Sequence, residues 1–217
     1  MIKKVFFIRH GELEYPRNEK GEPLVYGPMP SLSNLGKQQL EALGKEFKKN
    51  RIKLEVVYSS SYKRARESAE ILISELSRSI PLILTEELRD VDNFSWRGRT
   101  IKEHIKLCGG DIYSYPISKK DETLKQLSKR AINIFKKIIR TKYGLLAIVS
   151  HGDFLSVLVW TLEHKNYPTD YRRMVKNFYL AKGQVVQYEI DESLEIVKRV
   201  RLITVKNVEK SIEYWRK

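Results

Sequence analysis

The feature that most constrains the fold is the alternation of short apolar runs with longer segments of helical periodicity. Residues 4–8, 54–59 and 145–149 are rich in Val, Ile, Leu and Phe, a composition typical of buried strands. Residues 62–76 and 121–140 carry apolar side chains every three or four positions, the spacing of an amphipathic helix. Strands that alternate with helices predict an α/β fold with a mainly parallel sheet.

Other segments complete this pattern. Ser33 is a suitable N-cap for a helix that follows it, and the long stretch before it, residues 11–31, contains four prolines and three glycines. Such a stretch predicts an irregular loop, and long loops in compact domains are usually functional or mobile. We also expect a short strand at 81–85, a helix at 153–162, a hairpin of 185–190 with 195–205, and a helix at 208–215. A chain of 217 residues favours a single domain over 1–217.

The composition excludes several classes of protein. Cys108 is the only cysteine, which excludes an internal disulfide framework and a multi-cysteine zinc site. No apolar run approaches the roughly 20 residues of a membrane span, and the N-terminus lacks the long apolar region of a signal peptide. We therefore expect a soluble, cytoplasmic protein that does not enter a membrane.

The formal net charge of +14 has three interpretations. A positive field attracts anionic substrates, a basic surface can bind nucleic acid, and a surface rich in Lys and Glu can reflect adaptation to heat. The basic residues are spread along the chain rather than concentrated in one tail or helix, which disfavours nucleic acid as a partner. Charge alone does not decide between these interpretations.

Polar residues follow three of the predicted strands at the points where the strands end. Arg9 and His10 follow the first strand, Arg64 lies in the polar segment after the second, and His151 follows the strand at 145–149. In open α/β sheets, ligands bind beyond the carboxyl ends of the strands. We therefore expect two imidazoles and two guanidinium groups to meet at one anion-binding site.

These side chains suit a phosphate ester. Arginine forks match phosphate oxygens, and the N-terminal amides of helices add further donors. The imidazole of His10 can attack phosphorus and form a covalent intermediate, and neighbouring cations keep that imidazole neutral. Gly11 and Gly152 directly follow the two histidines and allow the backbone to approach the phosphate closely.

Competing interpretations are weaker. A single histidine at a strand end is usually structural, but two His-Gly pairs after apolar strands are hard to ascribe to chance. His104 and His164 lack this context, and we expect them to be ordinary surface or boundary residues. No arginine follows Cys108 six residues later, and the chain has neither a P-loop nor an HExxH motif, which excludes cysteine phosphatase, P-loop nucleotide and HExxH zinc chemistry.

Five motifs between residues 5 and 177 resemble, in order, the signatures of the histidine phosphatase superfamily. That family includes cofactor-dependent phosphoglycerate mutases and many phosphatases. The motifs are IRHGE at 8–12, LSNLGKQQ at 32–39, YSSSYKRARESA at 58–69, LRDVD at 88–92 with WRG at 96–98, and VSHG at 149–152.

The resemblance implies a phosphoglycerate mutase-like fold, a three-layer α/β/α sandwich with helices on both sides of the sheet. It implies that His10 is the phosphorylated nucleophile and that Arg9, Arg64 and His151 hold the phosphoryl oxygens. Asp90 aligns with the acidic proton donor, usually Glu in the family, and Asp92 is a nearby alternative. The resemblance implies no metal, and we expect no cofactor.

The chain departs from the family pattern at several positions. Pro16 stands where the family usually has Asn, and Asn18 is a nearby candidate to replace it. Phe94 and Arg97 replace the family's glycine and acidic residue around the tryptophan. Substrate contacts in the loop at 15–30 therefore cannot be transferred from the family.

We interpret the chain as a phosphomonoester hydrolase that acts on a small anionic phosphate ester through phosphohistidine. The first alternative is a cofactor-dependent phosphoglycerate mutase, which shares the nucleophile but returns the phosphoryl group to a substrate hydroxyl. The second alternative is a non-catalytic basic binding protein on the same scaffold. Exposed edge strands leave open a homodimer.

Overall fold

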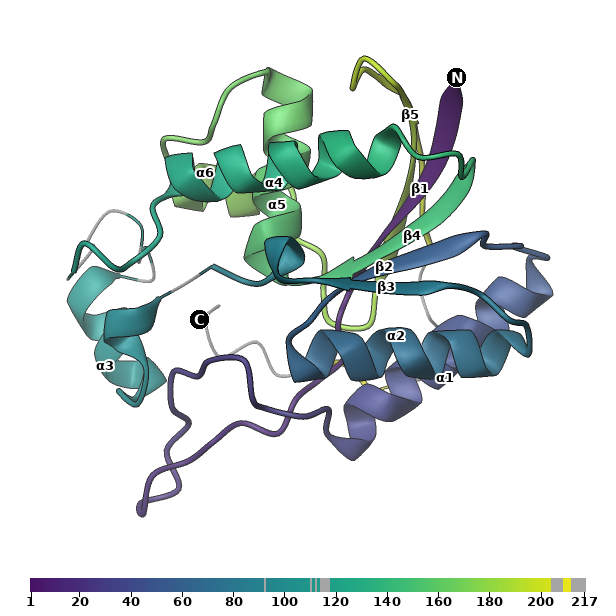
Figure 1. Cartoon of the computed structure of the whole chain (residues 1–217). Coiled ribbons are helices and arrows are strands. Elements are labelled where there is room, and N and C mark those ends of the chain that lie inside the picture. Colours follow the sequence, from purple (N-terminus) through teal and green to yellow (C-terminus); the bar gives the residue numbers. More distant parts are fainter. Residues whose placement is uncertain (92, 110, 112, 114–117, 204–208, 212–217) are drawn as a thin grey trace.

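The computed structural model describes residues 1–91, 93–109, 111, 113, 118–203 and 209–211 (Figure 1). Within these residues, six strands form one sheet of order β3-β2-β4-β1-β5-β6. The strands are β1 (Ile2–Arg9), β2 (Val56–Ser60), β3 (Leu82–Thr85), β4 (Leu145–Ser150), β5 (Val185–Asp191) and β6 (Ile196–Ile203). The helices are α1 (Asn34–Lys49), α2 (Lys63–Leu76), α3 (Ile101–Cys108), α4 (Leu124–Ile139), α5 (Gly152–His164) and α6 (Tyr171–Asn177).

The sheet is mainly parallel, as predicted. Strand β1 pairs in parallel with β4, β4 with β2, and β2 with β3. The predicted hairpin forms from β5 and β6, and β5 joins the sheet antiparallel to β1. The carboxyl ends of β1, β2 and β4 therefore lie side by side at one edge of the sheet.

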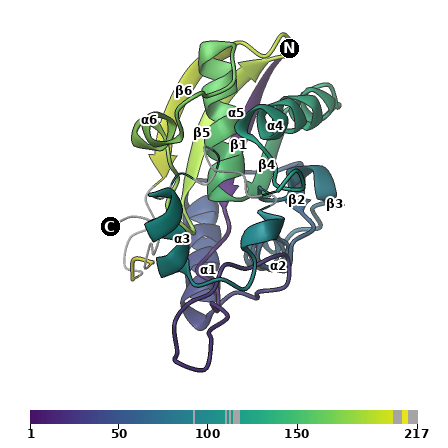
Figure 2. The ribbon, with the colours of Figure 1, turned by 90° about the vertical axis from the view of Figure 1, so that its left-hand side faces the viewer.

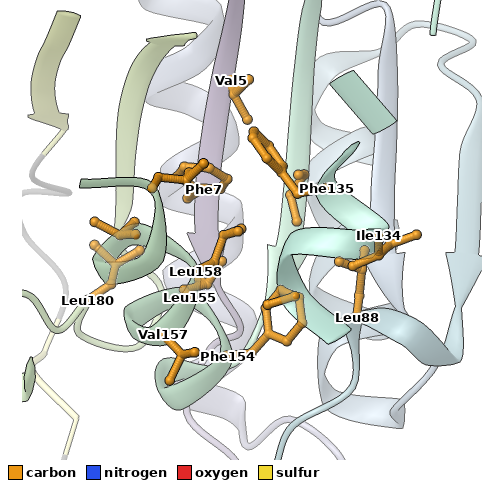
Figure 3. Packing of buried hydrophobic residues seen from close by; sticks show 14 of the residues in the cluster. Val5, Phe7, Leu88, Ile134, Phe135, Phe154, Leu155, Val157, Leu158 and Leu180 are labelled. Atoms are coloured by element: carbon orange, nitrogen blue, oxygen red, sulfur yellow. The ribbon is translucent and has the colours of Figure 1, made fainter. Parts of the chain in front are cut away.

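Helices cover both faces of the sheet, which gives the expected three layers (Figures 1 and 2). Successive side chains of a strand point to opposite faces. Accordingly, Val5 and Phe7 of β1 join the core beneath α4 and α5, where Phe7 lies 5.8 Å from the ring of Phe135 (Figure 3). Phe6 and Ile8 join the core on the side of α1 and α2.

Side-chain caps determine where two of the helices begin. Ser33 caps α1, because its Oγ accepts a hydrogen bond from the backbone N–H of Gly36. Thr123 caps α4 in a reciprocal capping box with Gln126, so this helix begins at Leu124 rather than at residue 121 as the periodicity suggested. The capping box satisfies two backbone donors that would otherwise lack partners.

Residues 11–31 form the expected irregular loop, which runs below the sheet toward α3 (Figure 1). The sequence did not predict α6. The helix expected at 208–215 falls largely outside the described residues. Among the described helices, none combines the length and the apolar character that a bilayer crossing requires.

Candidate active site

The three polar segments meet at the carboxyl ends of β1, β4 and β2. Arg9 pairs with Ser150 across the β1–β4 ladder, and the backbone N–H of His10 donates to the Ser150 carbonyl at 3.0 Å. Strand β2 lies on the other side of β4 and brings Ser60 to the same edge. The parallel register thus places residues that are far apart in sequence next to one another.

The two ring nitrogens of His10 face different partners, a backbone carbonyl and a guanidinium. Its Nδ1 lies 2.7 Å from the carbonyl oxygen of Gly11, which can only accept, so Nδ1 carries the proton and Nε2 keeps its lone pair. Arg64 Nε donates to that lone pair at 3.3 Å. Burial, followed by the charges of Arg64 and Arg9, lowers the pKa of His10 well below its usual value. The ring is therefore neutral and has the protonation state that a nucleophile requires.

Arg64 lies in the first turn of α2, is almost fully buried and uses each of its nitrogens. Besides its contact with His10, Nη1 donates to the Gly27 carbonyl and Nη2 to Asp90 Oδ2, both at 3.0 Å. The guanidinium therefore links the histidine, the long loop and the acidic residue. A planar fork can fix three partners at once, which a lysine ammonium on a flexible chain cannot do in the same way.

His151 lies directly opposite His10. The two ring centroids are 5.1 Å apart. His151 Nε2 lies 2.9 Å from Ser60 Oγ, and its Nδ1 is 3.5 Å from Asp90 Oδ2. Burial, and then the charge of Arg64, lowers the pKa of His151 as well. Two neutral imidazoles thus share one buried space.

Arg9 lies on the other side of the site. Its Nη1 donates to the carbonyl of Leu180 at 3.0 Å, and its guanidinium lies over the ring of Tyr179 at 4.8 Å. A Cβ on Gly152 would lie 3.0 Å from Arg9 Cζ and 2.6 Å from Tyr179 Oη. Gly152 is therefore required for the packing of Arg9 at the pocket wall.

The glycine after the first histidine has a different role. A Cβ on Gly11 would lie 2.5 Å from the carbonyl oxygen of Gly36, so this glycine lets the β1 loop pack against the first turn of α1. Gly152 lines the pocket, whereas Gly11 is not among the lining residues. The structure therefore accounts for Gly11 by its packing against α1.

Arg9, His10, Arg64, Asp90 and Gly152 line one pocket of about 780 Å³, a volume that includes open solvent at its mouth. His151 is fully buried and is not among the lining residues. Besides the predicted side chains of Arg9, His10, Arg64 and Asp90, the lining includes several residues that the sequence did not single out as ligand contacts, namely Tyr26, Tyr62, Asn93, Arg97, His104, Asp153, Tyr171 and Tyr179.

Two expectations for individual residues were wrong. His104 is not a boundary residue but is 1% exposed, packs edge-on against Trp96 at 4.4 Å and lines the pocket. Asn18 does not reach the pocket, because its side chain bonds to Glu22 within the loop. Asp92, the alternative proton donor, lies outside the described residues.

A buried ion pair supports the loop behind His10. Lys182 Nζ donates to both carboxylate oxygens of Glu12 at 3.1 Å and to Tyr15 Oη at 2.8 Å. The charge of Lys182 is a further cause of the lowered pKa of His10. Sequence inspection missed Lys182 because no recognisable motif surrounds it.

The arrangement can bind and polarise a phosphoryl group. The Arg64 guanidinium bonds to His10 Nε2, and the ring of His151 lies 5.1 Å from the ring of His10. The charge of Arg9 acts on the same neutral imidazole, and the Asp90 carboxyl group lies 3.0 Å from the Arg64 guanidinium. Positive groups aimed at the place where charge develops stabilise a phosphoryl-transfer transition state. A neutral ring nitrogen can serve as the attacking atom.

Known proteins resemble this chain in sequence and in fold. A 2,3-bisphosphoglycerate-dependent phosphoglycerate mutase of Parvibaculum lavamentivorans is 27% identical over 214 residues, covering 94% of this chain and 98% of the relative. The α-ribazole phosphatase of Shigella flexneri superposes with a TM-score of 0.72 at 20% identity, covering 97% of this chain and 99% of that one. A phosphoserine phosphatase of Entamoeba histolytica gives 0.65 at 21%, covering 98% and 99%.

The two solved structures show that the fold is shared. The family model for branch 1 of the histidine phosphatase superfamily matches residues 5–200, which is most of the chain. This protein therefore belongs to branch 1 of the histidine phosphatase superfamily.

Proposed function

We propose that the protein hydrolyses small anionic phosphate monoesters through a phosphohistidine at His10. The observation that carries this proposal is the state of the His10 ring. Its Nδ1 is bonded to the Gly11 carbonyl, its pKa is lowered by burial and by two arginines, and its Nε2 faces Arg64. A candidate nucleophile in its neutral form thus lies beside groups that are able to bind phosphate.

In the first step, His10 Nε2 attacks phosphorus and the bond from phosphorus to the ester oxygen breaks. Arg9, Arg64 and His151 bind the phosphoryl oxygens and stabilise their charge in the transition state. Asp90 gives a proton to the departing alcohol oxygen. Asp90 shares its Oδ2 with Arg64 and His151, and a phosphoryl group would compete for the same two donors.

In the second step, water attacks the phosphorus of phospho-His10. Asp90, now ionised, accepts a proton from that water. The bond from phosphorus to Nε2 breaks, and His10 returns to its neutral form while inorganic phosphate leaves. Both steps use the same positioned charges, so one site serves both displacements.

The net charge of +14 supports an anionic substrate, because a positive field raises the local concentration of anions. The candidate site lies in a pocket rather than on an open face, which favours a small ester over a macromolecule. The names of the solved neighbours include two phosphatases, which act on α-ribazole phosphate and on phosphoserine according to those names. These observations support hydrolysis of a small ester.

A phosphoglycerate mutase is the second candidate, favoured by the 27% identity to a mutase over 94% of the chain. The mutase and the hydrolase share His10 and differ in whether water or a substrate hydroxyl accepts the phosphoryl group. The test is turnover of 3-phosphoglycerate with and without 2,3-bisphosphoglycerate. We expect release of inorganic phosphate to exceed isomerisation, and the reverse result would establish the mutase.

A broader assay tests hydrolysis itself. The purified protein should release phosphate from p-nitrophenyl phosphate and from alkyl phosphates. Absence of release from every ester across a range of pH, together with salt-sensitive binding of nucleic acid, would instead support a basic binding protein.

A further inference from the structure

The pocket contains a second carboxylate whose place in the chemistry is not explained by phosphate binding. Asp153 lies in the first turn of α5, two residues after His151, and its side chain lines the same pocket as His10. Asp90 is engaged with Arg64 and His151, whereas the acceptor atoms of Asp153 face a different set of partners.

The partners of Asp153 are neutral hydroxyls. Tyr113 Oη donates to Oδ2 at 2.9 Å, and Tyr171 Oη donates to Oδ1 at 3.0 Å. These two bonds fix the orientation of the carboxylate and leave one further acceptor position on each oxygen. The carboxylate is thus held in place without a neutralising charge from these two residues.

The electrostatics of this carboxylate favour a cationic ligand. Burial and the negative charge of Asp90 raise the pKa of Asp153 to about 6, while the two tyrosine hydroxyls and the charge of Arg9 act in the opposite direction. The ionised form is therefore short of stabilisation in its present surroundings. A positive group that entered the pocket beside Asp153 would relieve that deficit.

Two aromatic rings lie beside the same carboxylate. The rings of Tyr113 and Tyr171 lie 5.0 Å apart, and Tyr171 lines the pocket. The faces of aromatic rings attract ammonium groups. A carboxylate framed by tyrosines is a suitable environment for a buried ammonium group, and it contrasts with the arginine-rich environment of the phosphate.

The distance along the chain between the two environments is short. His151, Gly152 and Asp153 are consecutive, and Gly152 packs against Arg9. Phosphate bound between Arg9, Arg64 and His151 would place the alcohol portion of the ester within the pocket that Asp153 lines. The geometry points to a substrate with opposite charges at its two ends.

We propose that Asp153, with Tyr113 and Tyr171, binds the ammonium group of the leaving alcohol, so that the preferred substrates are phosphate esters of short amino alcohols. This inference rests on the proposed hydrolase function. It makes Asp153 a residue that determines specificity for the leaving group.

The test compares two esters of nearly equal shape. O-phosphoethanolamine and propyl phosphate differ mainly by an ammonium group in place of a methyl group. The wild-type protein should have a kcat/KM roughly tenfold to a hundredfold higher for phosphoethanolamine, the range for a hydrogen bond to a charged group. Asp153→Asn should abolish this preference, so that the ratio of the two kcat/KM values falls to about 1.

A matched control removes a negative charge elsewhere. Glu70→Gln changes an exposed residue on α2, and the preference for phosphoethanolamine should remain as in the wild type. The preference of the wild type should also rise with pH through about 6 as Asp153 ionises, whereas the Asp153→Asn ratio should lack this increase.

The outcomes separate the two proposals. Equal kcat/KM values for both esters in the wild type, or an unchanged preference in a folded Asp153→Asn protein, would overturn the ammonium site and leave the hydrolase intact. If the protein hydrolyses none of the three esters, phosphoethanolamine, propyl phosphate and p-nitrophenyl phosphate, the proposed hydrolase function would be overturned. The wild-type comparison needs no variant, so the test does not depend on the folding of Asp153→Asn.

Discussion

Arg64 Nε lies 3.3 Å from His10 Nε2 and Arg64 Nη2 lies 3.0 Å from Asp90 Oδ2. One guanidinium therefore connects the proposed nucleophile with the proposed acid. The same cation helps to lower the pKa of His10 and keeps its ring neutral. Arg64 thus acts on both the position and the protonation state of His10, together with burial and the Gly11 carbonyl.

Arg64→Lys tests whether His10 needs the planar, forked guanidinium of Arg64. Lysine keeps the charge but cannot bond to His10, Gly27 and Asp90 in the geometry of the guanidinium. We expect kcat/KM for p-nitrophenyl phosphate to fall roughly 100-fold, comparable with the loss of a transition-state donor. Arg66→Lys is the control, because Arg66 lies exposed on the same helix and pairs with Glu70. A loss of less than about threefold in Arg64→Lys would contradict the role given to the fork.

Asp90→Asn tests the proton donor. A poor leaving group needs protonation and a good one does not, so the defect should depend on the ester. We expect kcat/KM to fall roughly 100-fold or more for an alkyl phosphate and far less for p-nitrophenyl phosphate. If Asp92→Asn shows that selective defect and Asp90→Asn does not, the donor is Asp92.

Gly36→Ala tests the close approach of the β1 loop to α1. A Cβ at this position would lie 2.0 Å from the carbonyl oxygen of Glu12, so the backbone must move. We expect the free energy of unfolding to fall by about 2 kcal/mol or more, as for other cases of overpacking. Gly144→Ala is the control, since the nearest atom to its Cβ is at 4.0 Å. Equal urea midpoints for the two variants would show that the loop moves with little loss of stability, and would contradict the prediction.

Buried neutral histidines predict a loss of stability in acid. Burial lowers the pKa of His104 to about 4, while the unfolded chain titrates near 6.5. Between these values the unfolded state binds more protons, so the free energy of unfolding falls as the pH decreases from 6.5 to about 4. We expect His104→Gln to flatten this decline, and the exposed His164→Gln to leave it unchanged. Chemical denaturation at several pH values gives the slope of the free energy of unfolding against pH for each protein. Equal slopes for the wild type and His104→Gln would argue against this titration.

Much of the fold was predictable because it depends on local patterns. The β-branched runs of β1 and β4 and the periodicity of α2 are visible within a short window of sequence. The convergence of His10, Arg64 and His151 followed from a general rule, that the carboxyl ends of parallel strands meet at one edge. Local pattern and sheet geometry were sufficient for these features.

Other parts of the site depend on tertiary contacts that no local pattern reveals. Lys182 reaches Glu12 across 170 residues, and Asp153 meets Tyr113 and Tyr171 from separate segments. His104 has an ordinary sequence context yet packs against Trp96. A signal was present only for Asp153, which follows the second His-Gly pair directly.

Several expectations stay predictions. These are a single domain over 1–217, a cytoplasmic location, a homodimer and the catalytic roles of the individual residues.

The most direct measurement of the central claim is the detection of a phosphoenzyme. Wild-type protein mixed rapidly with phosphate ester and quenched should carry one phosphoryl group that is stable in alkali and labile in acid. His10→Ala should carry none and should release no phosphate, whereas His164→Ala should behave like the wild type. Phosphorylation of His10→Ala, or turnover near the wild-type rate without His10, would contradict the account.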